Sequence, residues 1–377
     1  MKKIVPFVDL KEQYLSIQKD IDGAIHRVVS SGNFAQSEEV TSFESEFAKY
    51  NNAKYCVSLN SGTDALILGL RALNLQPGDE VIVPSFTFIA TAIAPVENGL
   101  TPVFVDVDER DYGLNLEDLQ KKITPKTKAI ICVHLYGQPD KISEIQDIIR
   151  KTKQKIYLIE DACQAHGATY KGKRVGTFGA FSAFSFYPTK NLGAYGDGGA
   201  VITNDKKIAD KIRSLKQYGE KIRYFSEEPG INSRLDSLQA SILRAKLKHL
   251  DRWNTKRKQL AQTYTELLTK QTPFIITPMA MKDREHVYHL YVIRTKKRDE
   301  LQKYLAEKNI SSLIHYPRPL HLQKVYRRYG YKKGDLPIVE KVASEVLSLP
   351  FYAEMTGESV QTVVDTIEKF YTSKLNF

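Results

Sequence analysis

Short apolar runs, rather than alternating apolar and polar positions, mark the expected strands between Lys54 and Glu160. The clearest runs are Tyr55–Leu59, Glu80–Pro84, Pro102–Val107, Ala129–His134 and Ile156–Glu160. A strand that is apolar at successive positions is typical of a sheet that is covered on both faces. The pattern therefore predicts a buried, mainly parallel sheet.

Helical patterns separate these runs, with apolar positions three or four residues apart. They cover Thr63–Leu73, Ile89–Asn98, Leu116–Ile123, Ser143–Lys151 and Lys206–Gln217. An alternation of strands and helices is the usual crossover arrangement of a parallel α/β sheet. Because ligands gather at the carboxyl ends of such strands, we expect the functional residues there.

The pattern differs at the two ends of the chain. Asp9–Val29 has the apolar spacing of one amphipathic helix. The alternation ends near Leu250, and the elements expected around and after this point are a long helix, two strands and a final helix, at Asp236–Leu268, His289–Arg294, Ser312–His315 and Ser359–Phe370. We therefore expect a large domain at residues 1–250 and a smaller α+β domain at 251–377.

Composition narrows the classes of protein. The 377 residues are 42% hydrophobic and 26% charged, which is ordinary for a folded protein and too long for one small module. Three cysteines, Cys56, Cys132 and Cys163, are too few for a disulfide framework or a zinc knuckle, so we expect reduced thiols, a cytoplasmic protein and no metal. Pro6 and Asp9 interrupt the basic start, which argues against a signal peptide or a membrane span.

The net charge of +11 is compatible with nucleic acid, anionic lipid or a small anionic ligand. The richest basic stretches are short and are broken by polar or aromatic residues; they are Arg252–Lys258, Lys296–Arg298 and Lys324–Lys333. We therefore expect a solvated basic face and no nucleic-acid partner.

Two polar segments follow expected strands. Ser58–Asp64 opens a helix at Thr63, so its free N–H groups can form a seat for a phosphate, although a plain helix cap explains the segment as well. Ile156–His166 carries Asp161 to the end of a strand, with Gln164 after it. A carboxylate there can pair with a protonated pyridine nitrogen or cap the next turn.

One lysine lies in an unusual setting. Lys190 follows a strand of small and aromatic residues, enters the glycine-rich turn Asn191–Gly199, and has no charged residue within five positions on either side. Desolvation at such a place lowers the pKa of an amine and keeps it available as a nucleophile. We favour a chemical role for Lys190 over that of an ordinary surface lysine.

Two further features complete a set of five. Phe88, at the exit of the strand that ends at Pro84, can lie flat against a planar ring or pack in the core. Asn232 belongs to the polar segment Ile231–Gln239, which enters a helix and is partly explained as its cap. Each feature is weak alone, and together they describe a pocket for one cofactor.

The chain resembles the DegT/StrS-type nucleotide-sugar aminotransferases over nearly its whole length. The motifs that carry the resemblance are SGTDAL (61–66), PSFTF (84–88), IEDACQAHGA (159–168), SFYPTKNLGAYGDGGA (185–200), NSRLDSLQA (232–240) and HYPRPLHLQ (315–323). The family consists of pyridoxal-phosphate enzymes. The resemblance implies their fold type I, an α/β fold with a mainly parallel seven-stranded sheet, helices on both faces and a smaller C-terminal α+β domain.

The resemblance also implies a role for each pocket residue. Lys190 is expected to form a Schiff base with pyridoxal 5'-phosphate, and Asp161 to pair with its pyridine nitrogen, which makes these two the catalytic residues. Asn232 is expected to reach the phosphate of a neighbouring subunit, since the family builds its sites across a homodimer. The other expected cofactor contacts are Gly62, Thr63, Phe88, Gln164 and Ser185.

The implied reaction moves the amino group of an amino acid, L-glutamate as is usual in the family, to a nucleotide-linked keto sugar, with pyridoxamine 5'-phosphate and 2-oxoglutarate formed on the way. The motifs at 159–168 and 185–200 are most like the branch that acts on 3-keto sugars. They favour C3 of a dTDP-3-keto-6-deoxyhexose, giving a dTDP-3-amino-3,6-dideoxyhexose for surface polysaccharide or glycoconjugate synthesis. C4 amination of a dTDP- or UDP-4-keto sugar stays open. Candidates for the sugar cleft, each of which can also be structural, are His315, Tyr316 and His321.

Two other functions fit less well. A related branch dehydrates sugars with a histidine in place of the lysine or with a cysteine-ligated cluster, whereas this chain keeps Lys190 and lacks those cysteines. A non-enzymatic regulator or nucleic-acid-binding protein accounts for the positive charge, but not for Lys190, Asp161 and Gln164 together. We therefore expect an enzyme.

Overall fold

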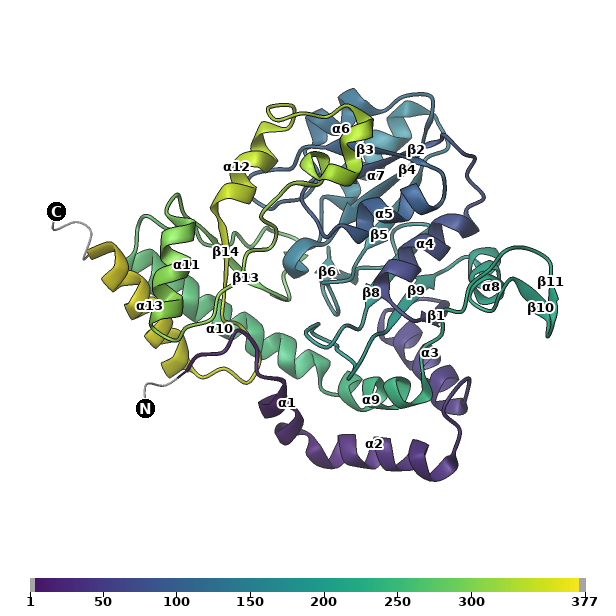
Figure 1. The fold of residues 1–377 in the computed structure, drawn as a ribbon, viewed down its shortest axis with the longest axis horizontal. Coiled ribbons are helices and arrows are strands. Elements are labelled where there is room, and N and C mark those ends of the chain that lie inside the picture. The colour runs from purple at the N-terminus through teal and green to yellow at the C-terminus, as the bar shows by residue number, and fades with distance from the viewer. Residues whose placement is uncertain (1–3, 373–377) are drawn as a thin grey trace.

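The main sheet has seven strands, in a computed structural model that describes residues 4–372 (Figure 1). The strands are β1 (Tyr55–Leu59), β2 (Glu80–Pro84), β3 (Thr101–Val105), β4 (Thr127–Val133), β5 (Tyr157–Asp161), β8 (Phe181–Ser185) and β9 (Gly199–Thr203). They lie in the order β1-β9-β8-β5-β4-β2-β3. The five strands expected from the sequence are all present, each within two residues of its expected bounds.

Strands β8, β5, β4, β2 and β3 run parallel, whereas β9 is antiparallel to both β1 and β8. The crossover helices are α4 (Gly62–Ala72), α5 (Ala90–Glu97), α6 (Leu116–Lys122) and α7 (Ile142–Thr152), and α8 (Lys206–Leu215) follows β9. The mainly parallel, seven-stranded α/β sheet is therefore confirmed. The parallel arrangement places the last residues of β2, β4, β5 and β8 at one edge of the sheet.

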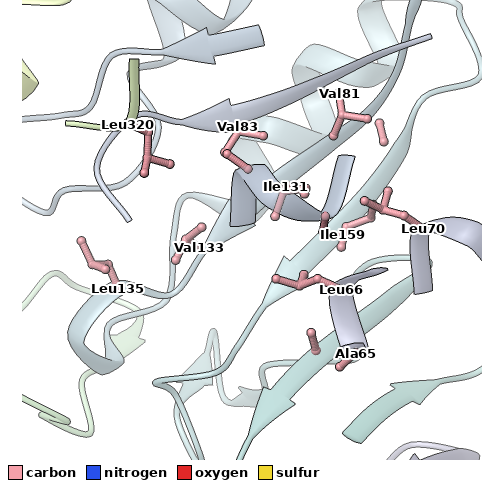
Figure 2. Packing of buried hydrophobic residues seen from close by; sticks show 14 of the residues in the cluster. Ala65, Leu66, Leu70, Val81, Val83, Ile131, Val133, Leu135, Ile159 and Leu320 are labelled. Carbon is pink, nitrogen blue, oxygen red and sulfur yellow. The ribbon is translucent and has the colours of Figure 1, made fainter. Parts of the chain in front are cut away.

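Successive residues of the strands belong to two hydrophobic cores, one on each face of the sheet. Val81 and Val83 pack in the same core as Leu66 of α4 (Figure 2). Ile82, which lies between these two valines, belongs to the opposite core together with Ile130 of β4. Burial on both faces is the reason that the strands are apolar at successive positions.

The N-terminal segment forms two helices where the sequence predicts one. Helix α1 (Leu10–Ser16) and helix α2 (Gln18–Ser31) are separated at Ile17, whose backbone leaves the helical region at φ −134° and ψ 25°. Ile17 and Ile21 still pack in one core with Ile242 of α9 (Ser237–Leu247). The break escapes sequence reasoning because neither glycine nor proline stands at it and the apolar spacing continues across it.

The long helix expected at Asp236–Leu268 is also two helices. Helix α9 ends at Leu247, and α10 covers Leu250–Gln271. The N–H of His249 still donates to the Lys246 carbonyl at 2.9 Å, so the chain bends between the helices within a single turn. The last helix, α13 (Gly357–Thr372), agrees with the expected one.

The expected strand at 312–315 is wrong. Strand β13 (Tyr291–Arg294) pairs with β14 (Val346–Leu349), and the 312–315 segment contributes one isolated bridge, between Leu313 and Ser348. Pro317 follows shortly after and has no N–H with which to extend the pairing.

A third core, around Tyr264, Tyr291 and Val360, fills the C-terminal region. The division into domains at residue 250 stays a prediction; Val5 forms a bridge to Ile310 across it. Met1–Lys3 and residues 373–377 lie outside the described residues, and within 4–372 no helix is long and apolar enough to span a bilayer. The remaining elements are α3 (Glu38–Tyr50), η1 (Leu135–Gly137), β6 (Thr169–Tyr170), β7 (Lys173–Arg174), β10 (Glu220–Ile222), β11 (Phe225–Ser226), β12 (Arg284–Glu285), α11 (Arg298–Glu307), η2 (Leu320–Leu322), η3 (Lys324–Tyr329) and α12 (Pro337–Glu345).

The packing of α4 on β8 leads to a prediction about stability. A Cβ atom at Gly69 would lie 2.3 Å from the ring of Phe181, so Gly69→Ala should lower the free energy of unfolding by about 1–3 kcal/mol, the usual cost of overpacking. The control is Gly23→Ala, since Gly23 lies inside α2 with nothing within 4 Å of an added Cβ. That variant should gain roughly 0.5–1 kcal/mol. Urea unfolding measures both, and equal stabilities of the two variants would contradict the packing argument.

Candidate active site

A cavity of about 540 Å³ opens at the carboxyl edge of the main sheet. It lies where α4 begins, where β5 and β8 end, and against the 315–316 segment of the C-terminal region. The structure thus gathers residues from distant parts of the chain around one space. The expected site residues that line it are Gly62, Thr63, Phe88, Asp161, Gln164, Ser185, Lys190, His315 and Tyr316.

The first turn of α4 forms one wall of the cavity. The Ser61 hydroxyl accepts a hydrogen bond from the Asp64 N–H at 3.1 Å, and the N–H groups of Gly62 and Thr63 point out of the helix. A Cβ atom at Gly62 would lie 2.8 Å from both Cys163 Sγ and Ser185 Cβ, so glycine is what lets α4 approach β8 so closely. Free N–H groups at the positive end of a helix dipole favour a phosphate here.

Asp161 is 6% exposed at the end of β5. Its Oδ2 accepts a hydrogen bond from Thr91 Oγ1 at 2.8 Å, and its Oδ1 accepts a longer one from the Cys163 N–H at 3.3 Å. A carboxylate has about four acceptor positions, so two neutral donors leave it able to accept another proton donor. A protonated ring nitrogen in the cavity would supply both that donor and the positive charge that a buried carboxylate needs.

Gln164 is held in place by two hydrogen bonds. Its Oε1 accepts from the Tyr136 N–H at 2.7 Å, and its Nε2 donates to the Tyr316 hydroxyl at 3.2 Å. The Tyr136 hydroxyl donates in turn to the carbonyl of His315. These contacts tie the loop after β5 to the 315–316 segment, so the wall is formed before any ligand binds.

Lys190 lies in the loop that follows β8, and its side chain lines the cavity. Desolvation lowers the pKa of its amine, while the Cys163 thiol and the Asp161 carboxylate act in the opposite direction. A lowered pKa raises the fraction of neutral amine at pH 7, which is the form that attacks a carbonyl carbon. The setting that the sequence predicted for Lys190 is therefore present.

Two aromatic side chains remain largely in solvent at the cavity. Phe88 is 52% exposed and Tyr187 is 53% exposed. The Phe88 ring centre lies 6.0 Å from that of Tyr316, so one side of the cavity is aromatic. Burial lowers the pKa of His315 to about 4, and this imidazole is therefore neutral at pH 7. Exposed aromatic rings around a cavity are typical of a ligand site.

Two expected site residues do not line the cavity. Asn232 is exposed on the segment before α9, where its backbone forms a bridge to Gln217. His321 is 1% exposed, and its ring shares hydrogen bonds with Ser85 Oγ at 2.7 Å and Glu340 Oε1 at 3.2 Å. These contacts satisfy the His321 ring within the fold. His321 therefore lies away from the cavity, unlike His315 and Tyr316 of the same motif.

Sequence reasoning missed several residues of the cavity. Thr91 is fully buried and supports Asp161 from behind, and the signal that could have revealed it is a polar residue inside the apolar segment 89–95, just after Phe88. His289 lies two residues before β13 and falls within the strand expected at His289–Arg294. The lining residues that were not expected include Thr87, Cys163, Tyr187, Thr189, Asp197 and His289.

The donor groups fit pyridoxal phosphate. Lys190 offers an amine for its carbonyl carbon, Asp161 a carboxylate for its ring nitrogen, and the start of α4 N–H groups for its phosphate. The set does not suit a metal ion: across residues 4–372, no group of three or more His, Cys, Asp or Glu side chains could hold one.

Residues 15–368 match the sequence profile of the DegT/DnrJ/EryC1/StrS aminotransferase family. The chain is 46% identical to the dTDP-3-amino-3,6-dideoxy-alpha-D-galactopyranose transaminase of Aneurinibacillus thermoaerophilus, over 97% of this chain and 99% of that protein. It is 45% identical to the pleiotropic regulatory protein of Geobacillus stearothermophilus, over 97% and 98%. It is 40% identical to the UDP-N-acetyl-3-dehydro-alpha-D-glucosamine 3-aminotransferase of Acidithiobacillus ferrooxidans, over 97% of this chain and 97% of that protein.

Solved structures share the whole fold. The crystal structure of DesV from S. venezuelae, in complex with a ketimine intermediate, has a TM-score of 0.94 at 43% identity and covers 97% of this chain and 98% of that chain. NtdA from Bacillus subtilis, with bound cofactor PMP, has a TM-score of 0.89 at 31% identity and covers 98% of this chain and 86% of that chain. The expected fold type and the expected cofactor are therefore both confirmed among solved relatives.

The hydrogen bond from Thr91 to Asp161 leads to a prediction. Thr91→Val keeps the shape of the side chain but removes the donor, so the Asp161 carboxylate is oriented less firmly at the cavity wall. Losing a hydrogen bond to a charged group costs about 1.5 kcal/mol or more, so the affinity for pyridoxal phosphate should fall about tenfold. Absorbance titration measures the affinity, with Thr255→Val on the exposed side of α10 as the control. An unchanged affinity would show that Thr91 does not support the site.

Proposed function

The chain belongs to the DegT/DnrJ/EryC1/StrS aminotransferase family and is a pyridoxal-phosphate-dependent sugar aminotransferase; from this premise we propose that it transfers the amino group of L-glutamate to C3 of a dTDP-3-keto-6-deoxyhexose. The observation that carries the proposal is the placement of Lys190, Asp161 and the start of α4 around one cavity. The products are 2-oxoglutarate and a dTDP-3-amino-3,6-dideoxyhexose, which would serve surface polysaccharide or glycoconjugate synthesis.

Lys190 has two roles in the proposed reaction, covalent attachment of the cofactor and proton transfer. When bound, pyridoxal phosphate supplies an electron sink that stabilises negative charge at the carbon that loses a proton. The nitrogen of Lys190 would hold the cofactor covalently, and the free amine that the amino donor displaces would carry the proton between the α-carbon of the donor and the cofactor. The lowered pKa of Lys190 supports both roles, because a protonated amine can neither attack nor accept a proton.

The remaining cofactor contacts orient the ring. The Asp161 carboxylate, held by Thr91, would keep the ring nitrogen protonated, and Gln164, held by the Tyr136 N–H, would contact the ring hydroxyl. Phe88 covers a face of the ring. The Gly62 and Thr63 N–H groups and the Ser185 hydroxyl hold the phosphate, which the geometry at the start of α4 supports.

The choice of sugar nucleotide is supported by two relatives. A relative that is 46% identical is named for a dTDP-3-amino sugar, which supports C3 and dTDP. A relative that is 40% identical is named as a 3-aminotransferase of a UDP sugar, so it also supports C3 and makes a UDP-linked keto sugar the second candidate. His315 and Tyr316 lie at the cavity wall that faces the small C-terminal region, where we place the sugar.

We further propose that the site is completed in a homodimer. Asn232 is exposed and does not reach the cavity of its own chain, which supports a contact with the cofactor phosphate of a partner. The hairpin β10–β11 projects from the body nearby and exposes apolar side chains, with Tyr224 78% and Phe225 71% exposed (Figure 1). Exposed apolar surface of this kind is typical of a protein interface.

A cytoplasmic location completes the proposal. It is supported by Cys56, Cys132 and Cys163, which are free thiols, and a reducing compartment preserves such thiols.

The direct test is turnover with a panel of 3-keto and 4-keto sugars linked to dTDP or UDP. Purified enzyme is supplied with L-glutamate, and NMR of the product locates the new amine. We expect the fastest turnover with dTDP-3-keto-6-deoxyhexose and an amine at C3. Faster turnover with a 4-keto or UDP-linked sugar would replace this substrate, and no turnover with any of them would overturn the proposal.

Lys190→Ala should reduce turnover by several orders of magnitude, because it removes both the covalent attachment and the proton carrier. The phosphate seat and Asp161 stay in place, so the variant should still bind the cofactor. Borohydride treatment followed by peptide mass spectrometry should attach the cofactor to Lys190 in the wild-type protein and to no residue in the variant. The exposed Lys151→Ala is the control. Near wild-type turnover of Lys190→Ala would refute the role.

The shared site can be tested by mixing two inactive or weakened variants, Lys190→Ala and Asn232→Ala. If Asn232 serves the partner's site, a mixed dimer contains one site with both residues intact, so the mixture should be more active than the sum of its parents. Subunits are first exchanged in mild denaturant, and light scattering verifies the dimer. Activity equal to the sum of the parents, or a fully active monomer, would contradict the proposal.

A further inference from the structure

A second buried lysine contacts the loop that carries Lys190. Lys246 of α9 is 0% exposed, and its Nζ donates a hydrogen bond to the Gly193 carbonyl at 2.8 Å. The same amine lies over the ring of Tyr195, 4.2 Å from its centre. Both contacts fall within five residues of Lys190, on the side of the loop that faces α9.

The loop is tight and is held at several other points. A Cβ atom at Gly193 would lie 2.2 Å from the Pro188 carbonyl oxygen, so the chain folds back on itself here without room for a side chain. The Tyr195 N–H donates to Gln239 Oε1 of α9 at 2.8 Å, and Asn191 Nδ2 donates to Asn254 Oδ1 of α10 at 2.9 Å. Helices α9 and α10 therefore hold the loop, and Lys246 adds a hydrogen bond from a buried amine.

Burying a lysine side chain costs desolvation free energy, because its amine loses contact with water. Desolvation lowers the pKa of Lys246 to about 7, opposed by the nearby Glu354 carboxyl. Methionine has a similar length, would pack in the same place and would carry no desolvation cost. A structural role in the core of α9 does not call for an amine, whereas holding a backbone carbonyl at a fixed point of a tight loop does.

We propose that Lys246 is a positioning residue that fixes the loop from Lys190 to Tyr195 and thereby the place of the Lys190 amine in the cavity. The inference rests on the proposed role of Lys190. Lys246 does not line the cavity, so it acts through the Gly193 carbonyl and the Tyr195 ring and not through contact with the substrate.

The first test uses the protein without cofactor and does not depend on its activity. Hydrogen–deuterium exchange, followed by mass spectrometry, reports the protection of the amides of residues 190–195, of which Lys190 and Ala194 donate to backbone carbonyls of the loop. In Lys246→Met these amides should exchange at least about tenfold faster than in the wild type. Lys248→Met, an exposed lysine just after α9, should leave them unchanged. Equal protection in Lys246→Met and wild type would overturn the proposal.

The second test separates positioning from a general loss of stability. In Lys246→Met, kcat should fall at least about tenfold while the KM for the keto sugar changes little, because the substrate wall is not altered. The absorbance band of the bound cofactor should also titrate at a shifted pH. Lys246→Arg keeps a charged donor and should recover part of kcat. A positioning role would be contradicted if Lys246→Met lost thermal stability without any change in kcat. Equal values of kcat in Lys246→Met and Lys246→Arg would contradict it as well.

If Lys246→Met does not fold, Lys246→Gln provides the same comparison, since its shorter side chain keeps an N–H donor but loses the charge. We expect lower protection of the loop amides and a lower kcat in Lys246→Gln than in the wild type. Wild-type values in both measurements would overturn the proposal. The exchange result is independent of the reaction, so it can succeed even where the Lys190→Ala test refutes the proposed function.

Discussion

Burial of the main sheet on both faces is the constraint on which the site depends. Strands without a solvent face carry few charged side chains along their length, so polar groups collect where the strands end. Asp161 and Ser185 are such terminal residues, of β5 and β8. Pairing fixes Asp161 opposite Ala183 and Val133, so the carboxylate is positioned by the sheet and not by a loop.

The close approach of α4 to the sheet supplies the opposite side of the cavity. A Cβ atom at Gly199 would lie 2.2 Å from the backbone of Ser61, just as one at Gly62 would meet Ser185. Two glycines thus allow the start of the helix to lie against the end of β8 and the start of β9. The loop that carries Lys190 connects β8 to β9, which pair with each other. The start of α4 and the Lys190 amine are therefore both positioned by this pair of strands.

Much of this arrangement could be predicted from the sequence, since its determinants are local. Runs of apolar residues locate the strands, and Asp161 and Lys190 are conspicuous because each follows such a run. Thr91 is different: its importance comes from a contact with a residue 70 positions away, which no local pattern records. His321 shows the reverse case, since it belongs to a motif of the expected site but is satisfied by Ser85 and Glu340 through long-range packing.

The two lysines on either side of one loop show that burial alone does not define a nucleophile. Desolvation lowers the pKa of both amines, yet Lys246 is occupied by a carbonyl and an aromatic face whereas Lys190 faces the cavity. A nucleophilic amine must stay free to form a covalent bond. A nearby carboxylate such as Asp161 can prevent this, because it can form an ion pair with the protonated amine. The hydroxyl of Thr91 occupies one oxygen of Asp161, so that oxygen is less available to the amine of Lys190. Buried residues behind the cavity, such as Thr91, therefore help to keep the Asp161 carboxylate hydrogen-bonded and the Lys190 amine free.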